Sequence, residues 1–300
     1  MSRAGDKQEI EGIRYKRFRR GGSRSKAKRA DTVFPGEKPF VVPTIVSTPG
    51  LGLDDPVLQP GSVVLPTVEM GCWTALRQVT IGGRQAFAGN IPLVSFNRTD
   101  PASRAFDQLR TLLLQILRSN GWNRVAISAP TQGCGSTFTA VNLGLSFARI
   151  PGSRTVLMDL NLRTPGIAKA LGIQSRGDAR GYLSGQIDTS QYLVRVKDTL
   201  ALGLAGSPDQ DAAELLHDPR TGVALSSMSD DLRPDVTLFD LPPILAFDDL
   251  AAFLPQVDGV LLVADGTKTT AAHIKACQRI LDGQTKVLGV TLNQARSAEQ

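Results

Sequence analysis

The hydrophobic residues that follow position 100 predict a helix and then a short buried strand. Apolar side chains recur at spacings of three and four from Phe106 to Leu117, so they share one face of a helix. Asp100-Pro101 is typical of a helix start, and Asn120-Gly121 is typical of a helix end. The apolar run at 125–128 is short, as expected for a strand that is buried on both faces.

A second helix is predicted from Ser136 or Thr137 onward. Its apolar positions again recur at spacings of three and four, which turns them toward the sheet. These positions are Phe138, Val141, Leu145 and Ala148. Asn142 and Ser146 are expected to lie off this apolar stripe.

The chain then alternates strand patterns with helical patterns up to position 293. Strands are expected at 155–159, 200–205, 236–240, 259–264 and 287–293. Helices are expected at 167–171, 211–216, 221–228, 248–254 and 270–281. Such alternation is typical of an α/β fold, a mostly parallel sheet with helices on both faces.

Residues 1–95 differ in composition and are expected to form a largely disordered, basic, Pro/Gly-rich arm and linker before a domain at 96–296. Residues 31–100 contain eight prolines and eight glycines and leave room for a helix only near 68–79. Trp73 and Phe87 are candidates to anchor this segment to the domain.

The positive charge is concentrated in the arm. Residues 1–30 carry a net charge of +8, and the whole chain carries +6. The remaining residues therefore carry a net charge of −2. The basic run at 14–20 favours a solvated arm, with anionic lipid as the alternative partner and nucleic acid as the less favoured one.

Cysteine usage and hydropathy favour a cytoplasmic protein. Cys72, Cys134 and Cys277 are far apart and form neither a CxxC pair nor a disulfide framework. No apolar run reaches the roughly 18 residues of a membrane helix, and the N-terminus lacks the apolar core of a signal peptide.

The segment from Ala129 to Thr137 has the layout of a phosphate-binding loop. Gly133 and Gly135 let the backbone turn its N–H groups inward, and the first helical turn adds unpaired N–H groups. The usual loop ends in Gly-Lys-Ser/Thr, where the lysine reaches the phosphates and the hydroxyl binds Mg²⁺. Here Ser136 replaces the lysine, and Thr137 keeps the hydroxyl. An ordinary turn with two glycines is the alternative interpretation.

Two further motifs place carboxylates after apolar strands. Asp159 ends one strand, and Asp240 ends another before Pro242-Pro243. Ligands of parallel sheets bind at the carboxyl ends of strands, where Asp240 is suited to hold Mg²⁺ through water. Either carboxylate alone would also fit a turn or a helix cap. Three such motifs, each at a strand end, indicate a nucleotide site.

Several motifs stand in a specific order between residues 106 and 293. They are Phe106-Asp-Gln-Leu-Arg-Thr111, Ala129-Pro-Thr-Gln-Gly-Cys-Gly135, Asn142-Leu143, Asp159-Leu-Asn-Leu-Arg163 with Pro165, Asp211-Ala-Ala-Glu-Leu-Leu216, Asp240-Leu-Pro-Pro243, Val257-Asp-Gly-Val-Leu-Leu-Val263 and Val287-Leu-Gly-Val-Thr-Leu-Asn293. Together they resemble the cytoplasmic P-loop domain of the bacterial tyrosine kinases of capsule and exopolysaccharide synthesis.

This resemblance implies a P-loop NTPase fold of the deviant-Walker type, ATP and Mg²⁺ as cofactors, and a homo-oligomer activated by a membrane polysaccharide co-polymerase at the inner face of the membrane. By position, Asp159 would be the base for the tyrosine hydroxyl, Thr137 and Asp240 would serve Mg²⁺, and Asn293 would lie near the adenine. The nucleotide-binding set would comprise Gly133, Cys134, Gly135, Ser136, Thr137, Phe138 and Asn293.

Four departures from the family pattern stand out, and the first two together are expected to weaken the activity. Ser136 replaces the phosphate-binding lysine, and Asn161 replaces the second carboxylate of the usual Asp-x-Asp. No tyrosine follows Asn293, so the acceptor cluster of the family is expected to be absent. Arg104 and Asp107 reverse charges that the family uses at its ring interface.

Three hypotheses result. The first is a tyrosine-kinase-like ATP-binding protein with weakened or lost phosphotransfer, a pseudokinase in exopolysaccharide assembly. The second is a non-enzymatic adaptor of the export machinery that no longer binds nucleotide. The third is a positioning ATPase of the chromosome- or division-site type, which usually carries an additional lysine where this chain has Thr131.

Overall fold

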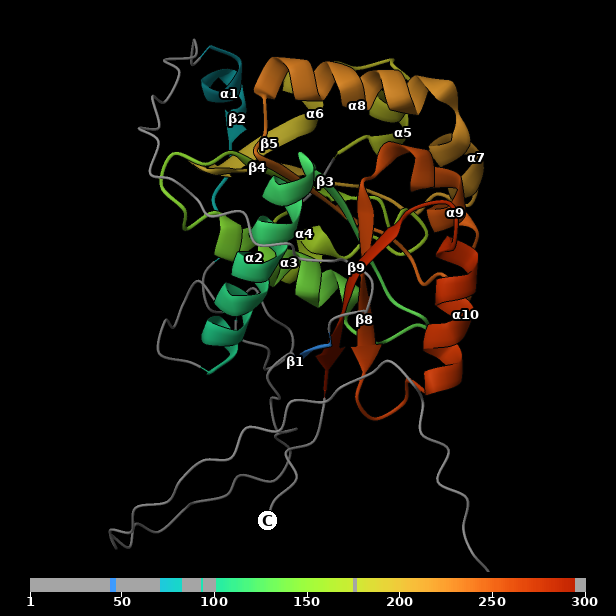
Figure 1. The fold of residues 1–300 in the computed structure, drawn as a ribbon. Helices are drawn as coiled ribbons and strands as arrows, with labels where there is room; N and C mark the ends of the chain where they lie inside the picture. The colour runs from blue at the N-terminus through green and yellow to red at the C-terminus, as the bar shows by residue number, and fades with distance from the viewer. Residues whose placement is uncertain (1–43, 47–70, 83–92, 94–100, 175–176, 295–300) are drawn as a thin grey trace, which may run out of the picture.

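The protein folds as a β-sheet with helices on both faces (Figure 1). A computed structural model describes residues 44–46, 71–82, 93, 101–174 and 177–294. The α/β class and the mostly parallel sheet predicted from the sequence are confirmed. None of the helices in these ranges is both long enough and apolar enough to cross a membrane.

The described residues form one nine-stranded sheet in the order β1-β9-β8-β3-β7-β4-β6-β5-β2. Neighbouring strands run parallel except for β1 with β9 and β5 with β6. The strands are β1 (Thr44–Val46), β2 (Arg77–Gln78), β3 (Arg124–Ser128), β4 (Thr155–Asp159), β5 (Leu193–Lys197), β6 (Leu200–Gly203), β7 (Val236–Asp240), β8 (Gly259–Asp265) and β9 (Lys286–Asn293). Strand β3 therefore lies between β7 and β8.

The helices form two layers. One layer contains α2 (Pro101–Asn120), α3 (Ser136–Phe147) and α4 (Ile167–Leu171). The other contains α1 (Gly71–Ala75), α5 (Ala179–Leu183), α6 (Thr189–Tyr192), α7 (Ala212–His217), α8 (Pro219–Leu232), α9 (Asp249–Phe253), the 3₁₀ turn η2 (Leu254–Gln256) and α10 (Ala271–Leu281).

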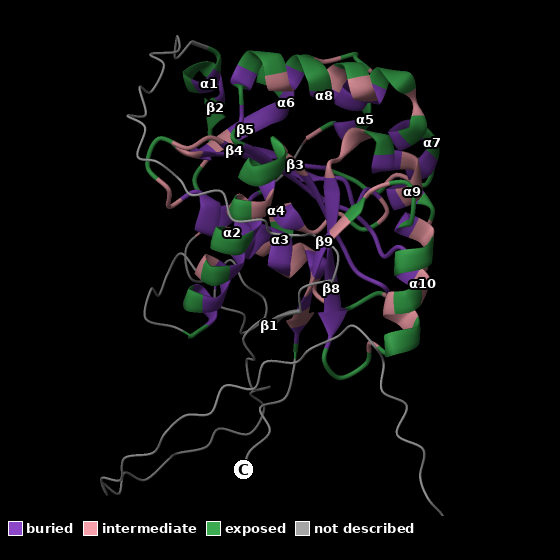
Figure 2. Cartoon of the chain, viewed as in Figure 1, coloured by how far each residue is buried: buried purple, intermediate pink, exposed green. Residues whose placement is uncertain are grey.

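Each layer has its own hydrophobic core, because successive strand residues point to opposite faces of a sheet. Val125 and Ile127 of β3 pack toward α2 and α3, whereas Ala126 packs toward the other layer. Strands β4, β6, β7 and β8 are buried along their whole length, whereas exposed residues lie on the outer sides of the helices, in loops and on the edge strand β2 (Figure 2). Each fully buried side chain of Val or Ile size contributes about 1.5–3 kcal/mol.

The polar residues Asn142 and Ser146 of α3 are buried, although the sequence pattern places them off the apolar stripe that faces the sheet. Both side chains are fully buried, because α2 packs over the outer side of α3. The Ser146 hydroxyl donates to the Asp107 carboxylate of α2 at 2.7 Å, and Asn142 donates to the Phe138 carbonyl at 3.0 Å. Asp107 also pairs with Arg149 and Arg110, so this cluster satisfies its charge inside the chain.

Part of the segment before residue 96 has described structure. β1 and β2 extend the two ends of the sheet, and Trp73 of α1 is 4% exposed. The Trp73 indole donates to the Asp198 carbonyl at 2.7 Å, so it anchors this segment as proposed from the sequence. Phe87 and the basic run at 14–20 lie outside the described residues.

Candidate functional site

The carboxyl ends of β3, β4 and β7 meet at one edge of the sheet, because these strands are parallel neighbours. Asp159 and Asp240 are direct register partners, and Asp240 is also paired with Ile127 of β3. The loop at 129–135 leaves β3 at the same edge. The structure therefore brings together the three motifs that the sequence places at strand ends.

The backbone of the loop has the form of an anion cradle. Gly133 and Gly135 have φ angles of 81° and 88°, which glycine adopts at little cost. Gly135 is the N-cap of α3 and provides no side-chain cap, so the first-turn N–H groups face the loop. The start of the loop is fixed by the Ile244 N–H, which donates to the Ala129 carbonyl at 2.9 Å. Such a helix start attracts phosphate groups.

Thr137 and Asp240 are joined directly. The Thr137 hydroxyl donates to Asp240 Oδ2 at 2.5 Å. Asp240 is fully buried, and its Oδ1 atom has no hydrogen-bond partner among the described residues. Burial raises the pKa of Asp240 well above its ordinary value, and the nearby Asp159 carboxylate raises it further.

Asp159 is held by the start of α4. Its Oδ2 atom accepts hydrogen bonds from the N–H groups of Gly166 and Ile167, both at 2.9 Å, whereas Oδ1 has no partner within the described ranges. Burial raises the pKa of Asp159 to about 7, although these backbone donors lower it in part. Two buried carboxyl groups side by side will not both ionise readily unless a cation lies between or beside them.

The oxygen atoms of this edge fit a hard cation such as Mg²⁺. Asp159 Oδ1 and Asp240 Oδ1 are buried and unpaired in the described structure, and the Thr137 hydroxyl lies beside them. No group of three or more His, Cys, Asp or Glu in these ranges could hold an ion by itself. A cation would therefore complete its shell with water and ligand oxygens, as Mg²⁺ does with phosphates.

The other predicted nucleotide-binding residues lie along the same loop. Ser136 opens α3 with a neutral hydroxyl and is 9% exposed. Cys134 is fully buried, with its Sγ atom 3.5 Å from the Thr131 hydroxyl. The Phe138 ring packs edge-on against Phe106 of α2, so its side chain supports the helix pair. Asn293 ends β9 against the loop and is 7% exposed.

Asn161 belongs to a local turn. Its side-chain carbonyl accepts a hydrogen bond from the Thr164 hydroxyl at 3.1 Å, and its backbone carbonyl accepts one from the Thr164 N–H at 3.0 Å. The amide therefore contributes no charge beside Asp159, which lies two residues before it.

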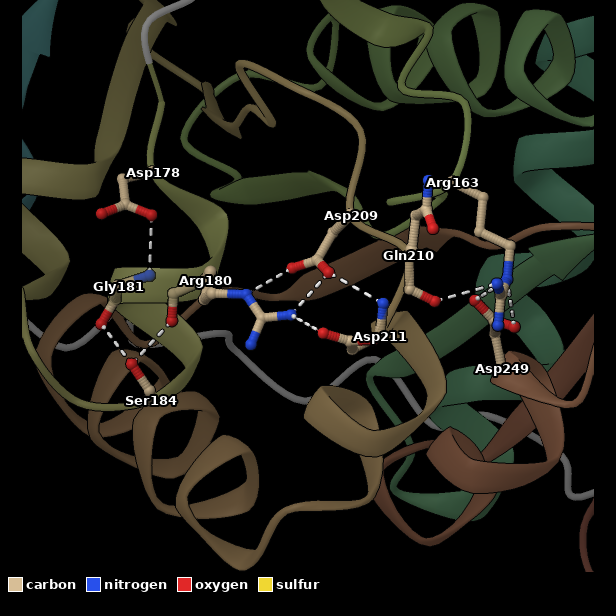
Figure 3. Close-up of polar contacts among 9 residues, drawn as sticks. All are labelled: Arg163, Asp178, Arg180, Gly181, Ser184, Asp209, Gln210, Asp211 and Asp249. Atoms are coloured by element: carbon tan, nitrogen blue, oxygen red, sulfur yellow. Dashed lines mark hydrogen bonds and ion pairs between the residues drawn. The ribbon is translucent and has the colours of Figure 1, made fainter.

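Arg163, the last residue of the Asp159–Arg163 motif, makes structural contacts at the site that the sequence pattern does not reveal. The Nε atom of Arg163 lies 2.9 Å from Asp249 Oδ2. A second guanidinium nitrogen, Nη1, donates to the Gln210 carbonyl at 3.0 Å (Figure 3). The guanidinium lies over the Phe247 ring at 4.8 Å from the centroid. Arg163 thus joins the loops that follow β4, β6 and β7. Its partner Asp249 is 86 positions away, which is why no local motif marks the pair.

Two of the three tyrosines lie inside the folded domain. Tyr182 and Tyr192 are 2% and 3% exposed and stack with ring centroids 4.3 Å apart. Burial raises the pKa of Tyr182 to about 12 and raises that of Tyr192 well above its ordinary value. Neither hydroxyl is accessible to another molecule in this fold. Tyr15, the third, lies outside the described residues.

Fold and site together define the class of a P-loop NTPase-like protein. The structure superposes on the kinase domain of the Escherichia coli tyrosine kinase ETK with a TM-score of 0.64 over 75% of this chain and 91% of that domain. At 23% identity this similarity shows the fold alone.

Sequence comparison shows which proteins this chain is similar to. The chain is 28% identical over 201 residues to the putative tyrosine-protein kinase EpsB of Ralstonia nicotianae, covering 65% of this chain and 26% of that protein. It is 27% identical over 201 residues to the tyrosine-protein kinase YwqD of Bacillus subtilis, covering 65% of this chain and 83% of YwqD. The homologues of this chain are thus bacterial tyrosine-protein kinases, and the resemblance stated from the motifs is confirmed.

No family model matches the chain. The chain spans about a quarter of the length of the first curated relatives that it matches.

Proposed function

We propose that this chain is a tyrosine-kinase-like P-loop protein that binds ATP with Mg²⁺ and acts in exopolysaccharide or capsule biosynthesis, with weakened phosphotransfer. The proposal is carried by one observation, the glycine loop set beside Thr137 and two buried carboxyl groups at adjacent strand ends. The tyrosine-protein kinases among its relatives support the same class of chemistry.

In this proposal the phosphates of ATP lie on the backbone N–H groups of residues 133–138. Thr137 and Asp240 hold Mg²⁺, in keeping with their direct hydrogen bond and with the unpaired Oδ1 atom of Asp240 in the described structure. When bound, Mg²⁺ neutralises charge on the transferred phosphoryl group.

Asp159 is proposed to take the proton from a tyrosine hydroxyl. A carboxyl group whose pKa is about 7 is a better proton acceptor near neutral pH than an ordinary aspartate, whose pKa is 3.8. The two N–H groups at the start of α4 fix its Oδ2 atom, so Oδ1 is the oxygen left to act.

The neutral residues at positions 136 and 161 support weakened phosphotransfer. Loss of one donor that stabilises transition-state charge costs about 10²- to 10³-fold in rate. Ser136 has a hydroxyl where the usual loop has an ammonium group, and the Asn161 amide replaces a carboxylate.

We further propose a cytoplasmic location at the inner face of the membrane, through a membrane polysaccharide co-polymerase as partner and as a homo-oligomer. These assignments rest on the family resemblance. Contact of the basic residues 14–20 with anionic lipid would assist such a location.

A non-enzymatic adaptor is the second candidate, favoured by the missing lysine at position 136. Isothermal titration of the full-length chain with ATP and Mg²⁺ separates the two. The kinase-like proposal predicts binding that is lost in Gly135→Ala, because a Cβ there would clash with the Asn293 amide nitrogen. If the parent chain shows no binding, the adaptor takes its place.

Gly283→Ala is the matched control for this titration. Gly283 also has a left-handed φ, of 73°, but an added Cβ would meet nothing within 4 Å. It precedes β9 and lies in the turn after α10, away from the loop. Its replacement should add similar backbone strain and leave nucleotide binding unchanged.

A further inference from the structure

The end of β9 makes two side-chain hydrogen bonds to the carbonyl groups of the phosphate loop. Asn293 Nδ2 donates to the Cys134 carbonyl at 2.9 Å, and Gln294 Nε2 donates to the Gly133 carbonyl at 3.1 Å. The partners are 159 and 161 positions apart in sequence, so these are contacts of the folded domain. We call Asn293 and Gln294 the β9 clamp.

The backbone of Gln294 is in a conformation that glutamine rarely adopts. Its φ angle is +54°, in the left-handed region that carries a cost for residues with a side chain. The other non-glycine residue with such a φ in the described ranges is Arg233, which ends helix α8. Gln294 ends no helix, and its strained backbone accompanies the bond to Gly133.

The loop is also held through the end of β8. The Thr269 hydroxyl lies 3.7 Å from Cys134 Sγ and accepts a hydrogen bond from the Asp265 N–H at 2.8 Å. The Gly266 N–H donates to the Asn293 carbonyl at 2.7 Å, which joins the ends of β8 and β9. The two neighbouring strands therefore form one support for the loop.

We propose that Asn293 and Gln294 are positioning residues that hold the phosphate loop in its anion-binding conformation before any ligand arrives. In a trans peptide the C=O and N–H groups point in opposite directions. Holding the carbonyls of Gly133 and Cys134 toward β9 therefore turns the N–H groups of Cys134 and Gly135 away from β9, toward the concave side of the loop. A loop fixed in this way loses less conformational entropy on binding an anion.

The use of this arrangement for nucleotide binding rests on the proposed function, but the clamp itself can be measured without any ligand. Cys134 is fully buried in the loop, Cys277 is fully buried in α10, and Cys72 is exposed. Labelling the full-length chain with a maleimide, followed by peptide mass spectrometry, reports the three thiols separately. Cys134 reports opening of the loop, and Cys277 reports unfolding of the domain.

Gln294→Ala is expected to speed labelling of Cys134 by about tenfold, the effect of losing one hydrogen bond, while Cys277 is unchanged. Gln294→Gly also removes the amide but relieves the left-handed strain, so it should speed Cys134 labelling without lowering the melting temperature. Gln284→Ala removes an amide that donates to the Ile280 carbonyl of α10. This control should change the labelling rate of neither Cys134 nor Cys277.

The inference is overturned if Cys134 is labelled at the parental rate in both Gln294→Ala and Gln294→Gly. It is also overturned if labelling of Cys277 becomes faster in parallel with that of Cys134. ATP titration of the two Gln294 variants is a separate measurement. It should show an ATP affinity several-fold weaker than that of the parent. If the parent binds no ATP while the thiol result holds, the proposed function fails and the clamp stands.

Discussion

Ser136 sets how much positive charge the loop can place next to a phosphate group. Ser136→Lys adds an ammonium on the first turn of α3, where its stem starts at the position used by the usual loop. ATP–Mg²⁺ binding should tighten by about tenfold, or about 1.4 kcal/mol, a conservative value for a charge-assisted contact. Equilibrium titration of parent and variant measures this change. Unaltered affinity would show that the loop is not a dormant nucleotide site.

Asn161 limits how much rate the added lysine can restore. The Ser136→Lys, Asn161→Asp double variant regains a carboxylate near Asp159, so its phosphotransfer rate should exceed that of Ser136→Lys alone. Transfer of labelled phosphate from ATP to a tyrosine peptide, with release of ADP, compares the two rates. Equal rates would show that residue 161 serves the turn that its hydrogen bond with Thr164 closes, and that it does not contribute to phosphotransfer.

Asp159 should make stability fall as the pH rises. Its pKa is about 7 in the folded chain and 3.8 when exposed, so its contribution is fully present below pH 3.8 and is lost as the pH rises through 7. Asp159→Asn keeps an oxygen for the N–H groups of Gly166 and Ile167 but removes the charge. Without divalent cations, the variant should melt higher than the parent near about pH 8, and the difference should shrink toward about pH 4.

Asp218 provides a control of opposite sign for these melting curves. Hydrogen bonds from Arg220 lower the pKa of Asp218 to about 2, so its contribution is present above pH 3.8 and is lost as the pH falls toward 2. Asp218→Asn should therefore melt slightly lower than the parent at neutral pH. A pH dependence of Asp159→Asn that matches the parent would contradict the assigned pKa of Asp159.

Part of the site could be predicted residue by residue. The loop, Thr137 and the two strand-end carboxylates are contiguous motifs, and parallel strands bring their ends together. The contacts that shape them could not be predicted. Asp159 is held by the start of α4, and the β9 clamp depends on a strained backbone at Gln294 that no residue type signals.

Arg163 is expected to stabilise three loops at once. Arg163→Met leaves the fully buried Asp249 carboxylate without its cation, which should lower the free energy of unfolding by about 3–5 kcal/mol. Urea denaturation measures the loss. Adding Asp249→Leu removes the stranded charge and should restore much of the stability.

Arg180→Met is the matched control for this pair. Arg180 binds Asp209 and Asp211, but its side chain is 50% exposed (Figure 3). Exposed ion pairs contribute about 0–1 kcal/mol. If Arg163→Met costs no more than Arg180→Met, the loops after β4, β6 and β7 are not held by Arg163.

At the level of elements, segments with their own sequence pattern or boundary signal were predictable, and segments that depend on tertiary pairing were not. Helix α4 has the predicted bounds, α2 begins at Pro101 as predicted, and β4 and β7 end at their aspartates. The patterns predict neither β5 nor the short helices α5 and α6. β5 gains its burial from antiparallel pairing with β6, which is a tertiary contact.

At the scale of the whole molecule, sheet order explains why one edge carries the chemistry. β3 lies between β7 and β8, so its loop has the carboxylates of β7 and β4 on one side and the ends of β8 and β9 on the other. The two outermost strands come from the segment before residue 96. The sheet therefore includes strands from the segment before the expected boundary at residue 96.

The measurement that tests the account most directly is ATP titration of the full-length chain with Mg²⁺ and with a chelator. Thr137→Val removes the hydroxyl bound to Asp240 and keeps the shape of the side chain. Thr139→Val is the control, since the Thr139 hydroxyl is buried in α3 without a partner in the described structure. The account predicts that Mg²⁺ tightens ATP binding by about tenfold or more in the parent and in Thr139→Val, and that Thr137→Val loses this gain. ATP binding that is absent from the parent, or a Mg²⁺ effect that survives in Thr137→Val, would contradict it.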